Sequence, residues 1–169
     1  MADTRENLKE AFAGESQANR KYTFFAEKAD DAGNKQVARL FRAAAEAETV
    51  HARNHLRVLG EIKSDRDNLG AAIGGEHYEF TTMYPGFIDQ AKKENNKAAT
   101  GSFDLANKVE QIHHRLFQAA LKNLEAGKGF KDAPYYVCQV CGNTVEGEAP
   151  DRCPICGAPR SKFKKVEQI

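Results

Sequence analysis

Residues 48–51 read Glu-Thr-Val-His, and residues 110–113 read Glu-Gln-Ile-His. Both segments lie in long stretches whose apolar residues recur at the three- and four-residue spacing of an amphipathic α-helix. Residues i and i+3 share one face of a helix, so each Glu can act together with its His. Two other helical stretches carry Glu15 and the pair Glu76 and Glu79. The pattern predicts four helices arranged around a shared polar site.

Apolar spacing and capping residues define the four predicted helices. They cover residues 3–32, residues 35–59, a stretch from about 67 past 87, and residues 96–126. Pro85 lies inside the third stretch, where we expect a kink rather than an end. Short connections and the lack of a strand pattern predict an all-α bundle.

The apolar faces of these helices are interrupted by charged and imidazole side chains. Burying one unpaired carboxylate costs several kcal/mol, and the whole stability of a domain is about 5–15 kcal/mol. A single Glu in such a place is usually tilted to solvent or salt-bridged. Two Glu-x-x-His motifs with a Glu on each remaining helix instead match a carboxylate-bridged dimetal site, and these ligands favour iron or manganese. The candidate ligands are Glu15, Glu48, His51, Glu76, Glu79, Glu110 and His113.

The ligand pattern repeats along the chain. Glu48 follows Glu15 by 33 residues, Glu110 follows Glu76 by 34, and a Gly directly precedes the first Glu of each pair. Two similar helix hairpins would therefore each contribute half of the site. Side chains with weaker claims are His55, His77, His114 and Tyr22, the last of which could hydrogen-bond a ligand carboxylate.

All four cysteines fall in two Cys-x-x-Cys-Gly segments, formed by Cys138 and Cys141 and by Cys153 and Cys156. Four thiolates at this spacing predict one tetrahedral metal site, which zinc and iron fill about equally well. A redox-active dimetal centre on the same chain favours iron. A Gly-Lys-Gly helix stop precedes this segment, so we predict a bundle over residues 1–131 and a small metal domain over residues 132–169.

In this order, the motifs resemble those of the rubrerythrin family across the whole chain. The resemblance implies a ferritin-like di-iron four-helix bundle followed by a rubredoxin-like domain of short strands, with three irons per chain. The stretches that carry it are Ala13-Gly14-Glu15-Ser16-Gln17-Ala18, Glu48-Thr49-Val50-His51, Gly75-Glu76-His77-Tyr78-Glu79, Glu110-Gln111-Ile112-His113 and the two cysteine segments.

The resemblance also implies a role for each ligand. Glu48 and Glu110 would bridge the two irons. Glu15 and Glu79 would bind one iron, and Glu76 with His113 would bind the other. His51 would replace Glu79 when the centre is reduced. Two tyrosines match those that lie beside the ligands in the family, Tyr22 and Tyr84.

The expected activity is that of a non-haem di-iron peroxidase. It would reduce hydrogen peroxide to water with electrons relayed through the rubredoxin-like iron, and so protect against oxidative stress. The chain has no Gly-x-Gly-x-x-Gly segment after a strand and no Walker motif, so we expect a separate NAD(P)H-dependent reductase or small electron carrier as partner. The alternatives are a ferritin-like iron-oxidising or iron-storage protein, and a pure electron carrier, which would leave five glutamates unexplained.

The charge balance excludes other classes of partner. The chain has 25 basic and 24 acidic residues and a net charge of +1, which argues against nucleic-acid binding and against a polybasic membrane patch. No apolar run approaches the roughly 18 residues of a membrane helix, and the N-terminal residues lack the apolar core of a signal peptide. We therefore expect a cytoplasmic protein.

The link between the second and third helices predicts a homodimer with exchanged hairpins. The ferritin-like topology implied by the resemblance makes these two helices parallel, so the chain must return along a helix of about 38 Å. About seven residues join Gly60 to Asp67, and they reach at most about 25 Å. Residues 3–60 of one chain would then pack with residues 67–126 of another. A simple up-down bundle within one chain is the alternative.

Overall fold

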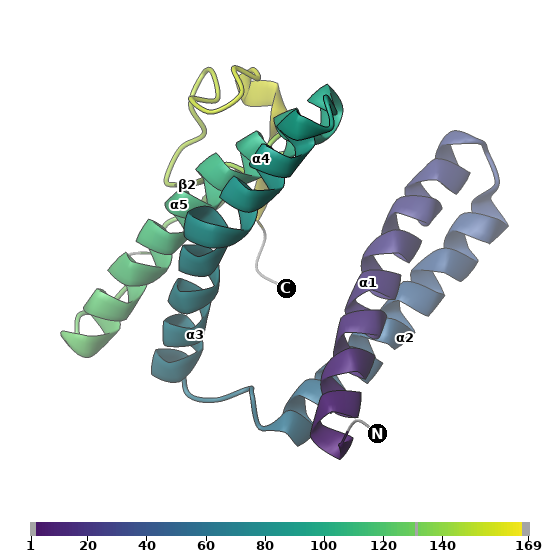
Figure 1. The fold of residues 1–169 in the computed structure, drawn as a ribbon, viewed down its shortest axis with the longest axis horizontal. Coiled ribbons are helices and arrows are strands. Elements are labelled where there is room, and N and C mark those ends of the chain that lie inside the picture. The colour runs from purple at the N-terminus through teal and green to yellow at the C-terminus, as the bar shows by residue number, and fades with distance from the viewer. Residues whose placement is uncertain (1–2, 131, 167–169) are drawn as a thin grey trace. The chain divides into compact units, whose positions relative to one another are not determined.

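The computed structural model describes residues 3–130 and 132–166, and its contacts divide the chain into the units Met1–Lys63 and Ser64–Ile169 (Figure 1). The first unit is a hairpin of helices α1 (Thr4–Asp31) and α2 (Lys35–Leu59). The second contains α3 (Asp65–Tyr78), the π-helical segment η1 (Glu79–Met83), α4 (Tyr84–Lys93), α5 (Lys97–Glu125) and a small sheet. The helices lie where the apolar spacing predicts them.

Small side chains let α1 and α2 approach closely. Ala26 and Ala38 are 1% and 0% exposed, and they belong to a buried stripe of alanines that follows the contact between the two helices. Asn19 adds a polar link, because its Nδ2 donates to the Ala45 carbonyl at 2.7 Å and to Thr49 Oγ1 at 2.8 Å. This link lies beside two predicted ligands: Glu15 precedes Asn19 by about one helical turn, and Glu48 precedes Thr49 in the chain.

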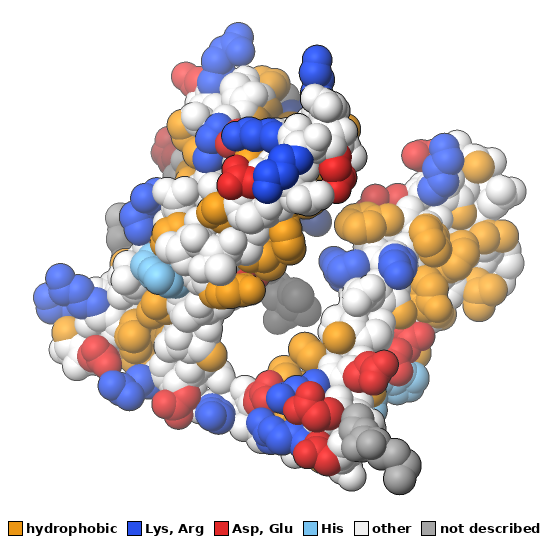
Figure 2. Space-filling model, viewed as in Figure 1, with side chains coloured by type: hydrophobic (Ala, Val, Ile, Leu, Met, Phe, Trp, Pro, Cys, Tyr) orange, Lys and Arg blue, Asp and Glu red, His pale blue; other side chains and the backbone are white. Residues whose placement is uncertain are grey.

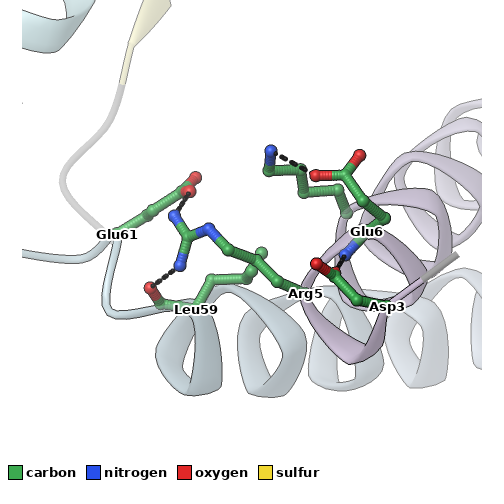
Figure 3. A network of polar contacts seen from close by, with 6 residues as sticks. Asp3, Arg5, Glu6, Leu59 and Glu61 are labelled. Atoms are coloured by element: carbon green, nitrogen blue, oxygen red, sulfur yellow. Dashed lines mark hydrogen bonds and ion pairs between the residues drawn. The ribbon is translucent and has the colours of Figure 1, made fainter.

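Polar contacts close the open end of this hairpin (Figure 3). Asp3 caps α1 by accepting a hydrogen bond from the Glu6 amide at 2.9 Å, as the spacing predicts. Arg5 donates to the Leu59 carbonyl at 3.4 Å and pairs with Glu61 at 3.1 Å. The arginine thus satisfies a carbonyl at the C-terminal end of α2, where cations also interact favourably with the helix dipole.

The hairpin also carries an exposed apolar face, seen as orange side chains in Figure 2. The helical spacing of apolar residues predicts that Val37, Leu40 and Val58 point inward, but they are 46%, 68% and 72% exposed. A pair of helices can bury only the stripe along which the two helices meet, so a second apolar stripe stays uncovered within this unit. In the part of the chain that the structure describes, no helix is both long and apolar enough to cross a membrane.

The third predicted helix is interrupted just before Pro85. Ser64 caps the start of α3, where its Oγ accepts a hydrogen bond from the Asp67 amide at 3.2 Å. The helix then widens into η1, and the Tyr84 amide donates to the Glu79 carbonyl, five residues back. In a regular helix the Pro85 ring would clash with the carbonyl four residues earlier, and the wider turn gives the ring room. The helical path therefore continues through Pro85, as predicted.

The small sheet is antiparallel, with the order β2-β1-β3 over the described residues. Its strands are β1 (Tyr135–Cys138), β2 (Thr144–Glu146) and β3 (Phe163–Val166), and a 3₁₀ turn, η2 (Arg160–Lys162), precedes β3. The two cysteine segments lie between β1 and β3 or overlap β1. The predicted domain boundary falls at residue 131, outside the described residues.

The alanine stripe leads to a test of hairpin packing. Ala38→Leu should lower the free energy of unfolding by about 1–3 kcal/mol, because the larger side chain forces α1 and α2 apart. Ala43→Leu, on the exposed side of the same helix, should change it by less than about 0.5 kcal/mol. Urea denaturation followed by circular dichroism measures both values. Equal effects of the two substitutions would contradict this packing.

Candidate metal centres

The first cluster of candidate ligands joins α1 to α2. His51 Nδ1 lies 2.9 Å from Glu48 Oε2 and 3.9 Å from Glu15 Oε1. One donor atom from each of the three residues lies within 4.8 Å of the donor atoms of the other two. Glu48 and His51 reach this point together because they lie one helical turn apart on α2.

The second cluster joins α3 to α5 and repeats this geometry. His113 Nδ1 lies 2.7 Å from Glu110 Oε2 and 3.9 Å from Glu76 Oε2. These three donor atoms also lie within 4.8 Å of one another. The internal repeat predicted from the ligand spacing thus appears as matching distances in the two units.

Each cluster has the chemistry of half a dimetal site. Two carboxylates that converge on one point repel each other unless a cation or a proton lies between them. Together the clusters supply four carboxylates and two imidazoles, the ligand set of the dimetal carboxylate bundles. The residues of the two clusters therefore fit a di-iron site in their chemistry.

Glu79 lies outside both three-residue clusters and begins the π-helical segment η1. Burial raises the pKa of its carboxyl, and the negative charge of Glu110 raises it further, which places Glu79 in the field of the second cluster. Its predicted role as a fifth carboxylate ligand stays a prediction.

Burial and crowding raise the pKa values of several groups around the second cluster. Burial, followed by a hydrogen bond and repulsion from Glu110, raises the pKa of Glu76 from 4.5 to about 7. The hydrogen bond with Glu110 raises the pKa of His113. Burial and the charge of Glu110 raise the pKa of Tyr84, so its phenol keeps its proton at neutral pH. Without metal, this cluster retains protons that a bound cation would replace.

None of the weaker candidates belongs to a cluster of donor atoms among the described residues. Tyr22 packs its ring against Phe25 and Phe41, with ring centroids 6.3 and 6.0 Å apart. His114 is half-buried and forms an aromatic group with His77 and Phe80, and it belongs to none of the three clusters of donor atoms. His55 is half-buried near the end of α2 and belongs to none of these clusters.

The four cysteines converge as free thiols. Cys138 Sγ lies 3.7 Å from Cys156 Sγ, and Cys141 Sγ lies 3.6 Å from Cys153 Sγ. A metal about 2.3 Å from each of four sulfurs requires sulfur–sulfur distances of about 3.8 Å. The predicted thiolate site therefore has the dimensions of a tetrahedral iron or zinc site.

Backbone amides favour the thiolate form of one cysteine in this site. Burial opposes ionisation of Cys153, but hydrogen bonds from the amides of Cys156 and Ile155 outweigh it and lower the pKa of this thiol from 9.0 to about 7. Burial raises the pKa of Cys141 despite the Asn143 amide that faces its sulfur. One thiol thus ionises near neutral pH, and a metal cation would favour ionisation of the others.

The sequence interpretation did not identify the contact between the cysteine segments and α5. His113 Nε2 lies 2.9 Å from Thr144 Oγ1, at the start of β2. Thr144 follows the glycine of the first cysteine segment by two residues, but this spacing does not reveal which helix it touches. Asn19 and Thr49, which link α1 to α2, were also missed, since lone polar residues on a helix give no recognisable pattern.

The chain matches two family models. The model "Rubrerythrin" covers residues 6–121, and the model "Rubrerythrin, rubredoxin-like domain" covers residues 136–164. Rubrerythrin-2 of Clostridium acetobutylicum is 36% identical over 177 residues, which cover 96% of each chain. Rubrerythrin of Porphyromonas gingivalis is 36% identical, with 97% of this chain and 90% of the relative covered.

Solved structures of nigerythrin resemble the whole chain. One, in a fully reduced, all-ferrous state, has a TM-score of 0.58 and 35% identity, and the match covers 98% of this chain and 88% of the other. These matches confirm the predicted fold class, an all-α ferritin-like part followed by a small rubredoxin-like part. The predicted cofactors are also confirmed, because the two Glu/His clusters fit a di-iron site and the four cysteines fit one further iron.

The raised pKa values predict how the metal-free protein responds to pH. A group whose pKa is higher in the folded protein than in the unfolded chain stabilises the fold below its unfolded value and loses this effect as pH rises. For Glu76 the loss falls between pH 4.5 and about 7, and His113 adds a loss above 6.5. The metal-free protein should therefore become less stable from pH 5 to pH 8, as urea denaturation can measure.

Glu76→Gln should remove most of the Glu76 contribution to this decline, whereas Glu10→Gln on the exposed surface of α1 should leave it unchanged. Iron-loaded protein should respond in the opposite direction, because protons displace the metal at low pH. Metal-free protein that gains stability over this range, with no difference between wild type and Glu76→Gln, would contradict the assignment.

Proposed function

The chain belongs to the rubrerythrin family, and on that premise we propose that it is a non-haem di-iron peroxidase that reduces hydrogen peroxide to water and protects against oxidative stress. One observation carries the proposal: a single chain combines two carboxylate–imidazole clusters with a four-thiol site. An iron store would need the first kind of site but not the second. An electron carrier would need the second but not the first.

The residues are assigned by cluster. Glu15, Glu48 and His51 would hold one half of the di-iron centre, and Glu76, Glu110 and His113 the other. Glu48 and Glu110 would bridge, and Glu79 would exchange with His51 as a ligand between oxidation states. The four cysteines would hold the third iron. When bound, the iron pair supplies two electrons and Lewis acidity for cleavage of the O–O bond, and the thiolate-bound iron supplies replacement electrons singly.

The protein side chains supply the fixed charges and protons around this chemistry. The carboxylates of the two clusters offset the charge of the cations, and each histidine contributes a neutral donor on the same helical face as its bridging glutamate. Tyr84 keeps its phenolic proton and lies in the field of Glu110, Glu79 and Glu76, so it can donate a hydrogen bond to a ligand carboxylate. Tyr22 would do the same beside Glu15.

Electrons would come from a separate protein, an NAD(P)H-dependent reductase or a small electron carrier. Val140, between the cysteines of the first Cys-x-x-Cys segment, is 53% exposed. The loop around the thiolate site therefore offers an apolar side chain to such a donor. The division between a bundle of residues 1–131 and a metal domain of residues 132–169 remains part of this proposal.

We also propose that the complete di-iron site combines two chains. α2 ends at Leu59 and α3 begins at Asp65, so five residues must join them. In the ferritin-like topology these helices are parallel, and the link would have to span about 38 Å, the length of α2. Five residues reach about 20 Å. Exchange of hairpins in a homodimer removes this requirement and gives the exposed apolar face of α1 and α2 a partner.

The thiolate site can be tested separately from the di-iron site. Cys138→Ser should reduce the iron content from three to two per chain, permit one round of peroxide reduction by pre-reduced protein, and abolish sustained turnover. Glu148→Gln, an exposed change between the two cysteine segments, should retain three irons and sustained turnover. Metal analysis and stopped-flow peroxide consumption with an added electron donor provide the measurements.

Two results would refute the proposed role of the thiolate site. Sustained turnover by Cys138→Ser at the wild-type rate would show that electrons enter the carboxylate site directly. Active native protein with only zinc in its cysteine site would exclude the electron relay.

A mixed dimer tests the exchange of hairpins. A Glu48→Ala chain and a Glu110→Ala chain, carrying different affinity tags, are co-expressed and the mixed dimer is isolated. With exchange, one site collects both substitutions and the other has every ligand, so about half of the wild-type di-iron content should remain. Without exchange, each site carries one substitution. Absence of any intact di-iron site from the mixed dimer would rule the exchange out.

A further inference from the structure

We infer that Thr144 is a positioning residue, which holds the His113 imidazole with Nδ1 directed at Glu110 and Glu76, where the metal would bind, and so couples the proposed di-iron ligands to the docking of the first cysteine segment on α5. The inference rests on the proposed di-iron function of His113. It assigns to Thr144 a role that none of the sequence motifs indicates.

The hydrogen bonds around Thr144 determine which atom donates. Thr144 Oγ1 lies 3.1 Å from the Gly142 carbonyl and 2.9 Å from His113 Nε2. A carbonyl can only accept, so the Thr144 hydroxyl donates its proton to Gly142 and its oxygen accepts from the histidine, which the Gly142 carbonyl also faces. His113 therefore carries a proton on Nε2. Its other ring nitrogen, Nδ1, faces Glu110 and Glu76.

This arrangement has the form of an outer hydrogen bond to a metal ligand. A ligating histidine usually donates its second N–H to a protein oxygen, which fixes the tautomer and orientation of the ring. Here the oxygen comes from the hydroxyl of Thr144, and that hydroxyl is oriented by the carbonyl of Gly142.

The backbone of the cysteine segment fixes the position of Thr144. The Gly142 amide donates to the Cys138 carbonyl at 2.8 Å, and the Cys138 amide donates to the Asn143 carbonyl at 2.9 Å. Gly142 has a φ of +82°, and a Cβ there would lie 3.7 Å from Val109 Cγ1. Val109 and Asn143 are 2% and 1% exposed. The loop that carries two of the cysteines thus packs directly on α5, one turn before His113.

The two half-sites differ in this respect. The His51 and His113 side chains have similar distances to their glutamates, but their exposed fractions are 53% and 27%. Contact with Thr144 contributes to the lower exposure of His113. The histidine held by Thr144 is the one proposed to remain a ligand in both oxidation states.

Substitutions of Thr144 test this role with metal binding as the readout. Thr144→Val keeps the shape of the side chain and removes the hydroxyl, and Thr144→Ser restores the hydroxyl. Thr100→Val is the matched control, because the Thr100 hydroxyl donates to the Asn96 carbonyl near the start of α5, thirteen residues before His113. The probe is Co²⁺ at the carboxylate site of the full-length protein, with the thiolate site already loaded with iron.

Thr144→Val should weaken Co²⁺ binding at one of the two positions by about 10–100-fold, the usual effect of losing an outer hydrogen bond to a ligand. Thr144→Ser should lie within about threefold of wild type, and Thr100→Val should match wild type. In NMR spectra of the Co²⁺ protein, a strongly shifted, exchangeable imidazole N–H signal should exchange faster with solvent in Thr144→Val. Absorption by the thiolate-bound iron checks that each variant retains its cysteine site.

Thr144→Ala serves the same purpose if the Val variant disturbs the fold. Unchanged affinity and N–H exchange in the hydroxyl-free variants would overturn the inference. If these variants bind Co²⁺ weakly but the wild type has no peroxidase activity, the inference stands and the proposed activity fails. If the wild-type carboxylate site binds no metal pair, both fail.

Discussion

Repulsion between converging carboxylates is the constraint on which the rest of this structure depends. Each of the two clusters directs two glutamates and one histidine to a common point, and the distances are nearly the same in both. Such a cluster is stable only if protons or cations offset its charge. In the second cluster, the raised pKa of Glu76 shows that a proton can offset the charge, and a bound metal pair would offset it instead. The helices therefore serve to hold groups that would otherwise move apart.

Much of the fold and of the ligand set could be predicted because helical periodicity makes both visible. A glutamate inside an apolar stripe conflicts with burial, and two Glu-x-x-His motifs explain the conflict together. The structure places Glu48 with His51 and Glu110 with His113 as that periodicity requires. The cysteine site could be predicted equally well, since both cysteines of each Cys-x-x-Cys pair lie in one turn.

Features that depend on contacts between distant segments could not be predicted in this way. Thr144 reaches His113 across 31 residues, and only the docked position of the loop reveals the contact. The π-helical turn before Pro85 reflects a local adjustment whose hydrogen-bond pattern is not encoded by apolar spacing. The prediction that Leu40 and Val58 point inward was wrong for a different reason. Periodicity identifies an apolar face, but it does not show whether the same unit covers that face.

The two helical units carry the same types of candidate ligand, but their surroundings differ. Only the unit Ser64–Ile169 contains the cysteine segments, and the first of them packs on α5 beside His113. A duplicated pair of equivalent half-sites would bind two metals in equivalent ways. The contact with Thr144 restrains the His113 ring, which belongs to the histidine proposed to stay a ligand in both oxidation states. In the proposed di-iron centre, the loop that carries two of the cysteines would therefore restrain one histidine ligand without contributing a ligand of its own.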